Sequence, residues 1–196
     1  MSERNNLFPV FLKLENLETL IVGGGHVGLE KLTALLKSSP GARITLIGRN
    51  IHEDIVALAR SFPLVKLVER NFRLWDLWDK DLVILATDDR RLHESIRSFS
   101  RSRNLLINVA DTPDLCDFYL GSVVTKGNLK IGISTNGKSP TMAKRLREYF
   151  EESLPESTNE LLDNMQKIRD QIKGDFNEKV KTLNDVTSSW LKERGV

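Results

Sequence analysis

The chain has 196 residues, of which 29 are basic and 27 acidic, so its formal net charge is only +2. Hydrophobic residues make up 40% and charged residues 29% of the sequence, which is typical of a globular protein with a sizeable core. The net charge is too small to favour binding to nucleic acid or to an anionic membrane surface.

Several other classes are excluded or disfavoured by residue content. No apolar run is long enough to span a bilayer, and the first residues lack the charged-then-apolar order of a signal peptide. Cys116 is the only cysteine, which excludes an internal disulfide and a cysteine-based zinc site. The three histidines have no metal-ligand spacing, and His93, within a predicted helix, is expected at the surface. We therefore expect a cytoplasmic protein without a metal site.

The first elements in chain order suggest a nucleotide-binding turn. Residues 9–14 are predicted to form a short strand, antiparallel to the strand that follows at 19–22. Gly23, Gly25 and Gly28 then have the G-x-G-x-x-G spacing, and apolar residues follow at helical spacing. In a dinucleotide site the first glycine permits the tight turn, the second lets the backbone approach the pyrophosphate, and the third lets helix and strand pack closely. The alternative is a glycine-rich bend that binds nothing, but a strand before and a helix after favour the dinucleotide site.

Strand and helix signals continue to alternate up to residue 111. Strands are predicted at 42–48, 65–70, 81–89 and 104–111, and helices at 52–62 and 90–103. This alternation predicts an α/β fold with a Rossmann-type parallel sheet and helices on both faces. Since ligands of such sheets bind at the carboxyl ends of the strands, three loops are expected to converge there, at 23–28, 86–89 and 108–118.

The pattern changes after residue 111, and we place the end of a dinucleotide-binding Rossmann domain, 1–113, just beyond it. A hairpin is predicted over 122–135 with its turn at 126–128, followed by a helix capped by Ser139. Residues 114–150 would form a small α+β segment and residues 151–196 a helical tail. The tail has an apolar stripe, interrupted by Gly174, that favours a packing face: Leu161, Met165, Ile168, Ile172, Phe176, Val180, Leu183 and Val186.

The choice between NAD and NADP stays open on residue chemistry. Dinucleotide sites often have an acidic residue about 20 positions past the glycines, where it binds the ribose hydroxyls. The corresponding strand here ends in Gly48, Arg49 and Asn50. Arg49 could pair with the 2′-phosphate of NADP, or it could be an ordinary solvated arginine.

Four segments, at 8–28, 82–89, 108–124 and 133–148, together resemble the precorrin-2 dehydrogenase family, the NAD-dependent module of siroheme synthesis. The resemblance extends from about residue 8 to 155. It implies oxidation of precorrin-2 to sirohydrochlorin with NAD as the hydride acceptor. It also implies a homodimer in which the segment after the Rossmann domain forms the interface and part of the substrate cleft. Some members also insert ferrous iron, as sirohydrochlorin ferrochelatases. The competing interpretation is a non-catalytic Rossmann module that senses NAD(H).

The motifs and the resemblance together select the site residues. Asp111 ends the last predicted strand; by itself it could be catalytic or a turn residue before Pro113, and the resemblance implies the catalytic role. Asn108 has a strand-end hydrogen bond as its alternative role. Asp88 and Asp89 could lie near the nicotinamide or could instead cap the next helix, with Thr87 as another candidate cap. The cofactor-binding residues are expected to be Gly23, Gly24, Gly25, His26, Val27, Gly28, Arg49, Thr87, Asp88 and Asn108. The polar approach to the helix is expected to bind the carboxylates of the substrate through Ser134, Thr135, Asn136, Gly137, Lys138 and Ser139.

Overall fold

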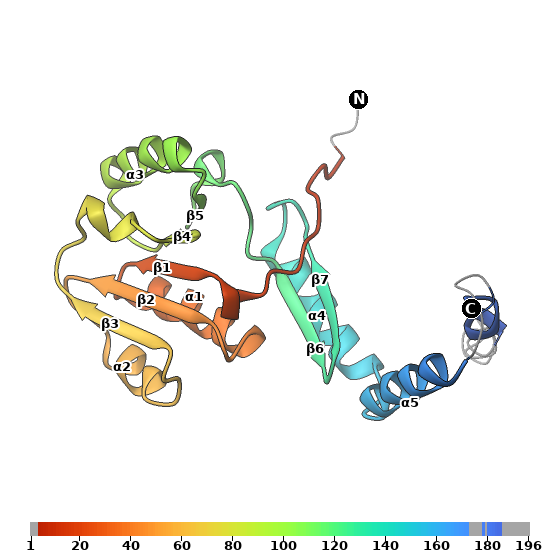
Figure 1. Ribbon diagram of the computed structural model, residues 1–196. Helices are drawn as coiled ribbons and strands as arrows, with labels where there is room; N and C mark the ends of the chain where they lie inside the picture. The colour runs from red at the N-terminus through yellow and green to blue at the C-terminus, as the bar shows by residue number, and fades with distance from the viewer. Residues whose placement is uncertain (1–3, 173–177, 179, 186–196) are drawn as a thin grey trace. The chain divides into compact units, whose positions relative to one another are not determined.

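The computed structural model describes residues 4–172, 178 and 180–185, and it divides into two compact units (Figure 1). The first comprises the described residues of Met1–Gly121 together with Asn136–Lys138, and the second those of Ser122–Thr135 and Ser139–Val196. Three positions of the expected tail stripe, Gly174, Phe176 and Val186, lie outside the described residues.

The first unit is built on a five-stranded sheet in which every pairing is parallel. The strands follow the spatial order β3-β2-β1-β4-β5. The chain adds β2 and β3 on one side of β1 and then crosses to the other side of β1 to add β4 and β5. This is the Rossmann-type α/β fold that the alternating pattern predicted. The strands are β1 (Glu18–Val22), β2 (Arg43–Gly48), β3 (Val65–Glu69), β4 (Leu82–Leu85) and β5 (Leu106–Val109).

Helices cover both faces of this sheet, as Figure 1 shows. Helices α1 (His26–Ser38) and α2 (Glu53–Ala59) pack on one face, whereas α3 (Arg90–Arg103) and the 3₁₀ turn η2 (Leu74–Leu77) pack on the other. Successive strand residues alternate between the two cores, so that Ile21 contacts the α1 side and Leu20 the α3 side. With both faces covered, the central strands are apolar at almost every position.

The predicted strand at 9–14 is wrong. These residues form no strand; the segment ends in a 3₁₀ turn, η1 (Leu14–Asn16), and Phe8, Val10 and Phe11 are exposed. The physical reason is the position of β1. Because β2 and β4 already occupy both of its edges, β1 has no hydrogen-bonding edge left for an antiparallel neighbour.

The second unit contains the predicted hairpin and helix. Strands β6 (Ser122–Lys126) and β7 (Leu129–Ile133) pair antiparallel, and α4 (Pro140–Ser153) follows. The Ser139 hydroxyl accepts a hydrogen bond from the Met142 N–H at 3.1 Å, so this residue caps α4 as expected. Helix α5 (Thr158–Gln171) then begins, and the Asn159 side chain ties it to the hairpin turn by accepting from the Asn128 N–H at 2.9 Å.

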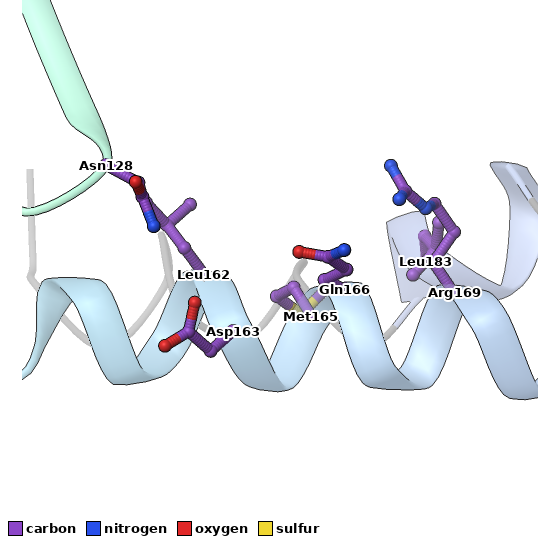
Figure 2. Close-up of a pocket in the computed structure, with 7 residues that line it drawn as sticks. All are labelled: Asn128, Leu162, Asp163, Met165, Gln166, Arg169 and Leu183. Atoms are coloured by element: carbon purple, nitrogen blue, oxygen red, sulfur yellow. The ribbon is translucent and has the colours of Figure 1, made fainter. Parts of the chain in front are cut away.

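Helices α4 and α5 leave apolar side chains exposed. On α4 these are Met142, Leu146 and Tyr149, which lie on one face at helical spacing. Along α5 there is a hollow of about 570 Å³ whose lining mixes apolar, amide and charged groups (Figure 2): Asn128, Leu162, Asp163, Met165, Gln166, Arg169 and Leu183. None of the helices within the described residues is long and apolar enough to cross a membrane.

Candidate active site

A cleft of about 940 Å³ lies in the first unit, at the carboxyl ends of its strands. The three loops expected to converge do so here, after β1, β4 and β5, and the end of β2 contributes as well. The cleft brings together most of the cofactor residues named from the sequence and the candidate catalytic acid, namely Gly23, Gly24, Gly25, His26, Val27, Arg49, Thr87, Asp88 and Asp111.

The glycines of the turn after β1 differ in their surroundings. Gly23 has φ +127°, and a Cβ there would lie 2.3 Å from the carbonyl oxygen of Ala86. A Cβ on Gly28 would lie 2.1 Å from the carbonyl oxygen of Gly23, so this position packs α1 closely on the turn. Gly25 is exposed, and an added Cβ would meet no atom within 4 Å. The first two positions therefore serve the fold, whereas Gly25 leaves open space above the backbone.

That open space suits a pyrophosphate. Helix α1 begins at His26, and no side chain caps its N-terminus. The first N–H groups of a helix have no acceptor within the helix, and together with the dipole they favour an anion. The turn thus offers a close approach at Gly25 and backbone donors directly behind it, which fits a dinucleotide.

Arg49, at the end of β2, is held by a residue distant in the sequence. Its Nε donates to Oδ1 of Asn71 at 2.8 Å, while the neighbouring Arg70 forms a bidentate ion pair with Asp76 at 2.7 and 2.8 Å. The guanidinium of Arg49 therefore lines the cleft with one of its donors already satisfied. Sequence reasoning could not anticipate this tether because Asn71 follows a different strand.

The loop after β4 places one polar pair deep in the cleft. Asp89 caps α3 by accepting from the Leu92 N–H at 3.0 Å, so of the two aspartates with capping as their alternative role, Asp89 has it. His93 is only 3% exposed, and its Nε2 lies 2.8 Å from Oγ1 of Thr87.

The surface position expected for His93 is therefore wrong. With Ile96 and Ser100 it forms the face of α3 that packs on the sheet, a spacing that the helix pattern could have shown. Burial lowers the pKa of His93, although the nearby carboxylates of Asp89 and Asp88 oppose this shift.

Asp111 follows β5 in a conformation uncommon for a residue with a side chain. It is exposed at the cleft, and its φ of +56° is in the left-handed region, which aspartate tolerates better than most residues. The loop that carries it is fixed at both ends: the Ala110 N–H donates to the Leu85 carbonyl at 2.9 Å, and the Asp117 N–H to the Ile107 carbonyl at 2.8 Å. Unusual backbone conformations held by their surroundings are common at functional sites.

Two other polar residues hold this loop rather than line the cleft. Asn108 is buried, and its Nδ2 donates to the Phe118 carbonyl at 2.8 Å, which is the strand-end hydrogen bond considered as its alternative role. The structure therefore does not bring Asn108 to the cleft. Asp117 accepts from the Ile107 N–H at 3.1 Å and pairs with Arg97. Although burial raises the pKa of Asp117, these bonds lower it by more, so it stays below the usual range.

The polar segment expected to bind substrate has a defined local conformation. Asn136 and Gly137 both have positive φ, at 54° and 74°. Oγ1 of Thr135 accepts from the Ser139 N–H at 3.3 Å and donates to the Ser139 carbonyl at 3.1 Å, which fixes the entry to α4. The Ser139 hydroxyl is used by the helix cap, whereas Ser134 and Lys138 are exposed.

Comparison with known families agrees with this geometry. Residues 10–122 match the family described as "Putative NAD(P)-binding", and residues 126–153 match the family described as "Sirohaem biosynthesis protein central". The first match covers more than half of the chain. The chain belongs to this NAD(P)-binding family. The resemblance found in the motifs is thereby confirmed, and a nicotinamide dinucleotide is supported as the cofactor.

Individual relatives point the same way. The siroheme synthase of Psychrobacter cryohalolentis is 38% identical over 185 residues, which are 94% of this chain and 34% of that protein. The siroheme synthase of Ruthia magnifica is 30% identical over 187 residues, 95% of this chain and 38% of that protein. The chain thus spans about a third of the length of these relatives. The solved structure of SirC, a precorrin-2 dehydrogenase, has a TM-score of 0.70 at 21% identity, covering 92% of this chain and 89% of that one, which confirms the fold.

The glycine turn provides the first prediction. Gly23→Ala places a side chain against the Ala86 backbone at a positive φ, and it should lower the free energy of unfolding by about 3 kcal/mol or more. Gly25→Ala should change that free energy by less than about 1 kcal/mol but weaken NAD binding at least about ten-fold, because the methyl group occupies the approach of the pyrophosphate. Denaturant titration and NAD titration measure the two effects. Normal NAD affinity in Gly25→Ala would contradict the assignment of the turn.

Proposed function

We propose that the chain is an NAD-dependent dehydrogenase that oxidises precorrin-2 to sirohydrochlorin in siroheme biosynthesis. The observation that carries the proposal is that the open glycine turn and the exposed carboxylate of Asp111 line one cleft at the carboxyl ends of the strands. A sensor of NAD(H) would need the first of these features but not the second. The siroheme synthase relatives supply the substrate class.

In this reaction the substrate loses a hydride and a proton, so the site must provide for both. NAD, when bound, accepts the hydride. The N–H groups at the start of α1 would hold its pyrophosphate, and the space above Gly25 would admit it. The role of Asp111 concerns the proton that the substrate loses. An exposed carboxylate can accept that proton or accept a hydrogen bond from a pyrrole N–H, and either role needs its charge.

The substrate itself carries eight carboxylates. We propose that Ser134, Thr135, Asn136, Gly137, Lys138 and Ser139 contact them. Support comes from the chemistry of the segment, since two left-handed residues precede the N-terminus of α4 and a lysine lies between them and the cap. A cytoplasmic location stays a prediction from the sequence.

Replacement of Asp111 tests the proposed reaction. Asp111→Asn keeps the shape of the side chain and removes its charge, so turnover should fall by about 10²-fold or more while NAD affinity stays near normal. The assay mixes the protein with precorrin-2 and NAD under anaerobic conditions and follows NADH and sirohydrochlorin absorbance.

The matched control is Asp114→Asn, since Asp114 is an exposed acid of the same loop whose ion pair with Arg90 is long, at 3.7 Å. Asp117, another acid of this loop, is unsuitable because its bonds to Arg97 and to the Ile107 N–H hold the loop. Turnover of Asp111→Asn at the rate of the unmodified protein would show that Asp111 is a turn residue.

We propose NAD rather than NADP as the acceptor. The preference follows the family resemblance, and the tether of Arg49 to Asn71 agrees with it, because one guanidinium donor is already used. Steady-state kinetics with the two cofactors should give a kcat/KM at least about ten-fold higher with NAD. A preference for NADP that Arg49→Ala abolishes would instead show that Arg49 pairs with the 2′-phosphate.

We further propose a homodimer formed by residues 114–196. The open stripe on α4, Met142, Leu146 and Tyr149, needs an apolar partner, and a two-fold pairing would cover it. Sedimentation at micromolar concentration should show a dimer that Leu146→Glu dissociates. The matched control is Val56→Glu on α2, because Val56 and Leu146 are both 37% exposed. A monomeric wild-type protein, or a Leu146→Glu variant that remains dimeric, would contradict the proposed interface.

A further inference from the structure

The fold gives a direction to any dinucleotide in the cleft. Its pyrophosphate belongs at the turn after β1, and its adenosine ribose beside the end of β2, where Arg49 and Asn50 lie. The nicotinamide half must then extend to the other side of β1, over the ends of β4 and β5. Thr87 and His93, which follow β4, line that half of the cleft. This inference rests on the proposed nicotinamide cofactor.

Thr87 and His93 form a single polar unit there. The imidazole is buried between α3 and the sheet, and its Nε2 lies 2.8 Å from Oγ1 of Thr87. In one tautomer of the neutral imidazole, Nε2–H donates to the hydroxyl oxygen. In the other, Nε2 accepts the hydroxyl hydrogen. An imidazolium, by contrast, always donates. Protonation of His93 would oblige Thr87 to accept and would turn the hydroxyl hydrogen toward another acceptor.

The charge of the ring matters at this position. Burial lowers the pKa of His93, which favours the neutral ring. The charged groups that act on it are Asp89, Asp88 and Arg90, from its own loop and helix. From the segment after β5, Asp114 pairs with Arg90, and Asp111 lines the same cleft. Oxidised nicotinamide carries a positive charge and reduced nicotinamide carries none, so an imidazolium here would repel only the oxidised form.

We propose that His93 is a positioning residue: it orients the Thr87 hydroxyl toward the nicotinamide end of the cofactor and, as a neutral ring, lets that end bind in its positively charged, oxidised form. Nothing in the glycine motif indicates this role, because the motif follows β1 whereas His93 lies on the helix after β4. The pair would set how strongly the cleft prefers NAD⁺ to NADH.

The test measures the affinities of NAD⁺ and NADH separately, without tetrapyrrole, between about pH 8 and about pH 5. For the wild-type protein, acidification should weaken NAD⁺ binding about five-fold more than NADH binding. His26 also lines the cleft, but it begins α1, where it would face the pyrophosphate that both forms share, so it is expected to affect the two forms alike.

Three variants separate positioning from a merely structural role. His93→Gln keeps a polar partner for Thr87 but does not titrate, so it should abolish the extra pH dependence of NAD⁺ binding and stay near wild-type affinity at about pH 8. His93→Leu should weaken both forms about five-fold at that pH. Thr87→Val, which leaves the buried ring in place, should weaken them to a similar extent, and His93→Leu should then add little to it.

The proposal is overturned if His93→Gln keeps the wild-type difference between NAD⁺ and NADH across pH, or if Thr87→Val binds both forms normally. A protein that binds neither form would overturn the proposed cofactor and this inference with it. A protein that shows the expected binding pattern but does not oxidise precorrin-2 would refute the proposed reaction and leave the role of His93 intact.

Discussion

Close backbone contact at the turn after β1 is the constraint on which the first unit depends. Gly23 lies against the carbonyl of Ala86, Gly24 against that of Asn50, and Gly28 against Gly23 itself. These approaches, each too tight for a Cβ, fix the end of β4, the end of β2 and the start of α1 around one point. The backbone that borders the cleft is therefore fixed by close packing of the main chain at these glycines.

Around that point the candidate site residues are supported by groups that lie outside the cleft. Asp111 keeps its left-handed conformation because the ends of its loop are pinned to the ends of β4 and β5 by backbone hydrogen bonds. Asn108 and Asp117 add side-chain bonds to the same loop. Rigid support of this kind holds a reacting group in position without further ordering when substrate binds. At β4, the Asp89 side chain caps α3, while Thr87 and His93 form a polar pair that lines the cleft.

Local patterns predicted most of the fold, and non-local pairing accounts for the failures. The limits of α3 and the Ser139 cap of α4 follow from helical spacing and capping chemistry, which act within a few residues. The strand expected at 9–14 failed because its existence depends on a free edge, and β2 and β4 leave β1 none. Among site residues, the glycine turn, Thr87 and Asp111 follow from strand ends, whereas the burial of His93 depends on which face of α3 meets the sheet. The tether of Arg49 to Asn71 joins two strands and is invisible in a linear pattern.

The central position of β1 also affects the order in which the sheet can assemble during synthesis. Of the five strands, β1 is synthesised first, and β2 can pair with one of its edges as soon as it has been synthesised. Its other edge pairs with β4, where Thr19 lies opposite Leu82. Until that later segment emerges, the nascent chain exposes an apolar strand with an unpaired row of backbone groups, which is the kind of edge that recruits neighbouring chains. The strand order that forms the cleft in the folded protein thus exposes the nascent chain to aggregation until β4 has been synthesised.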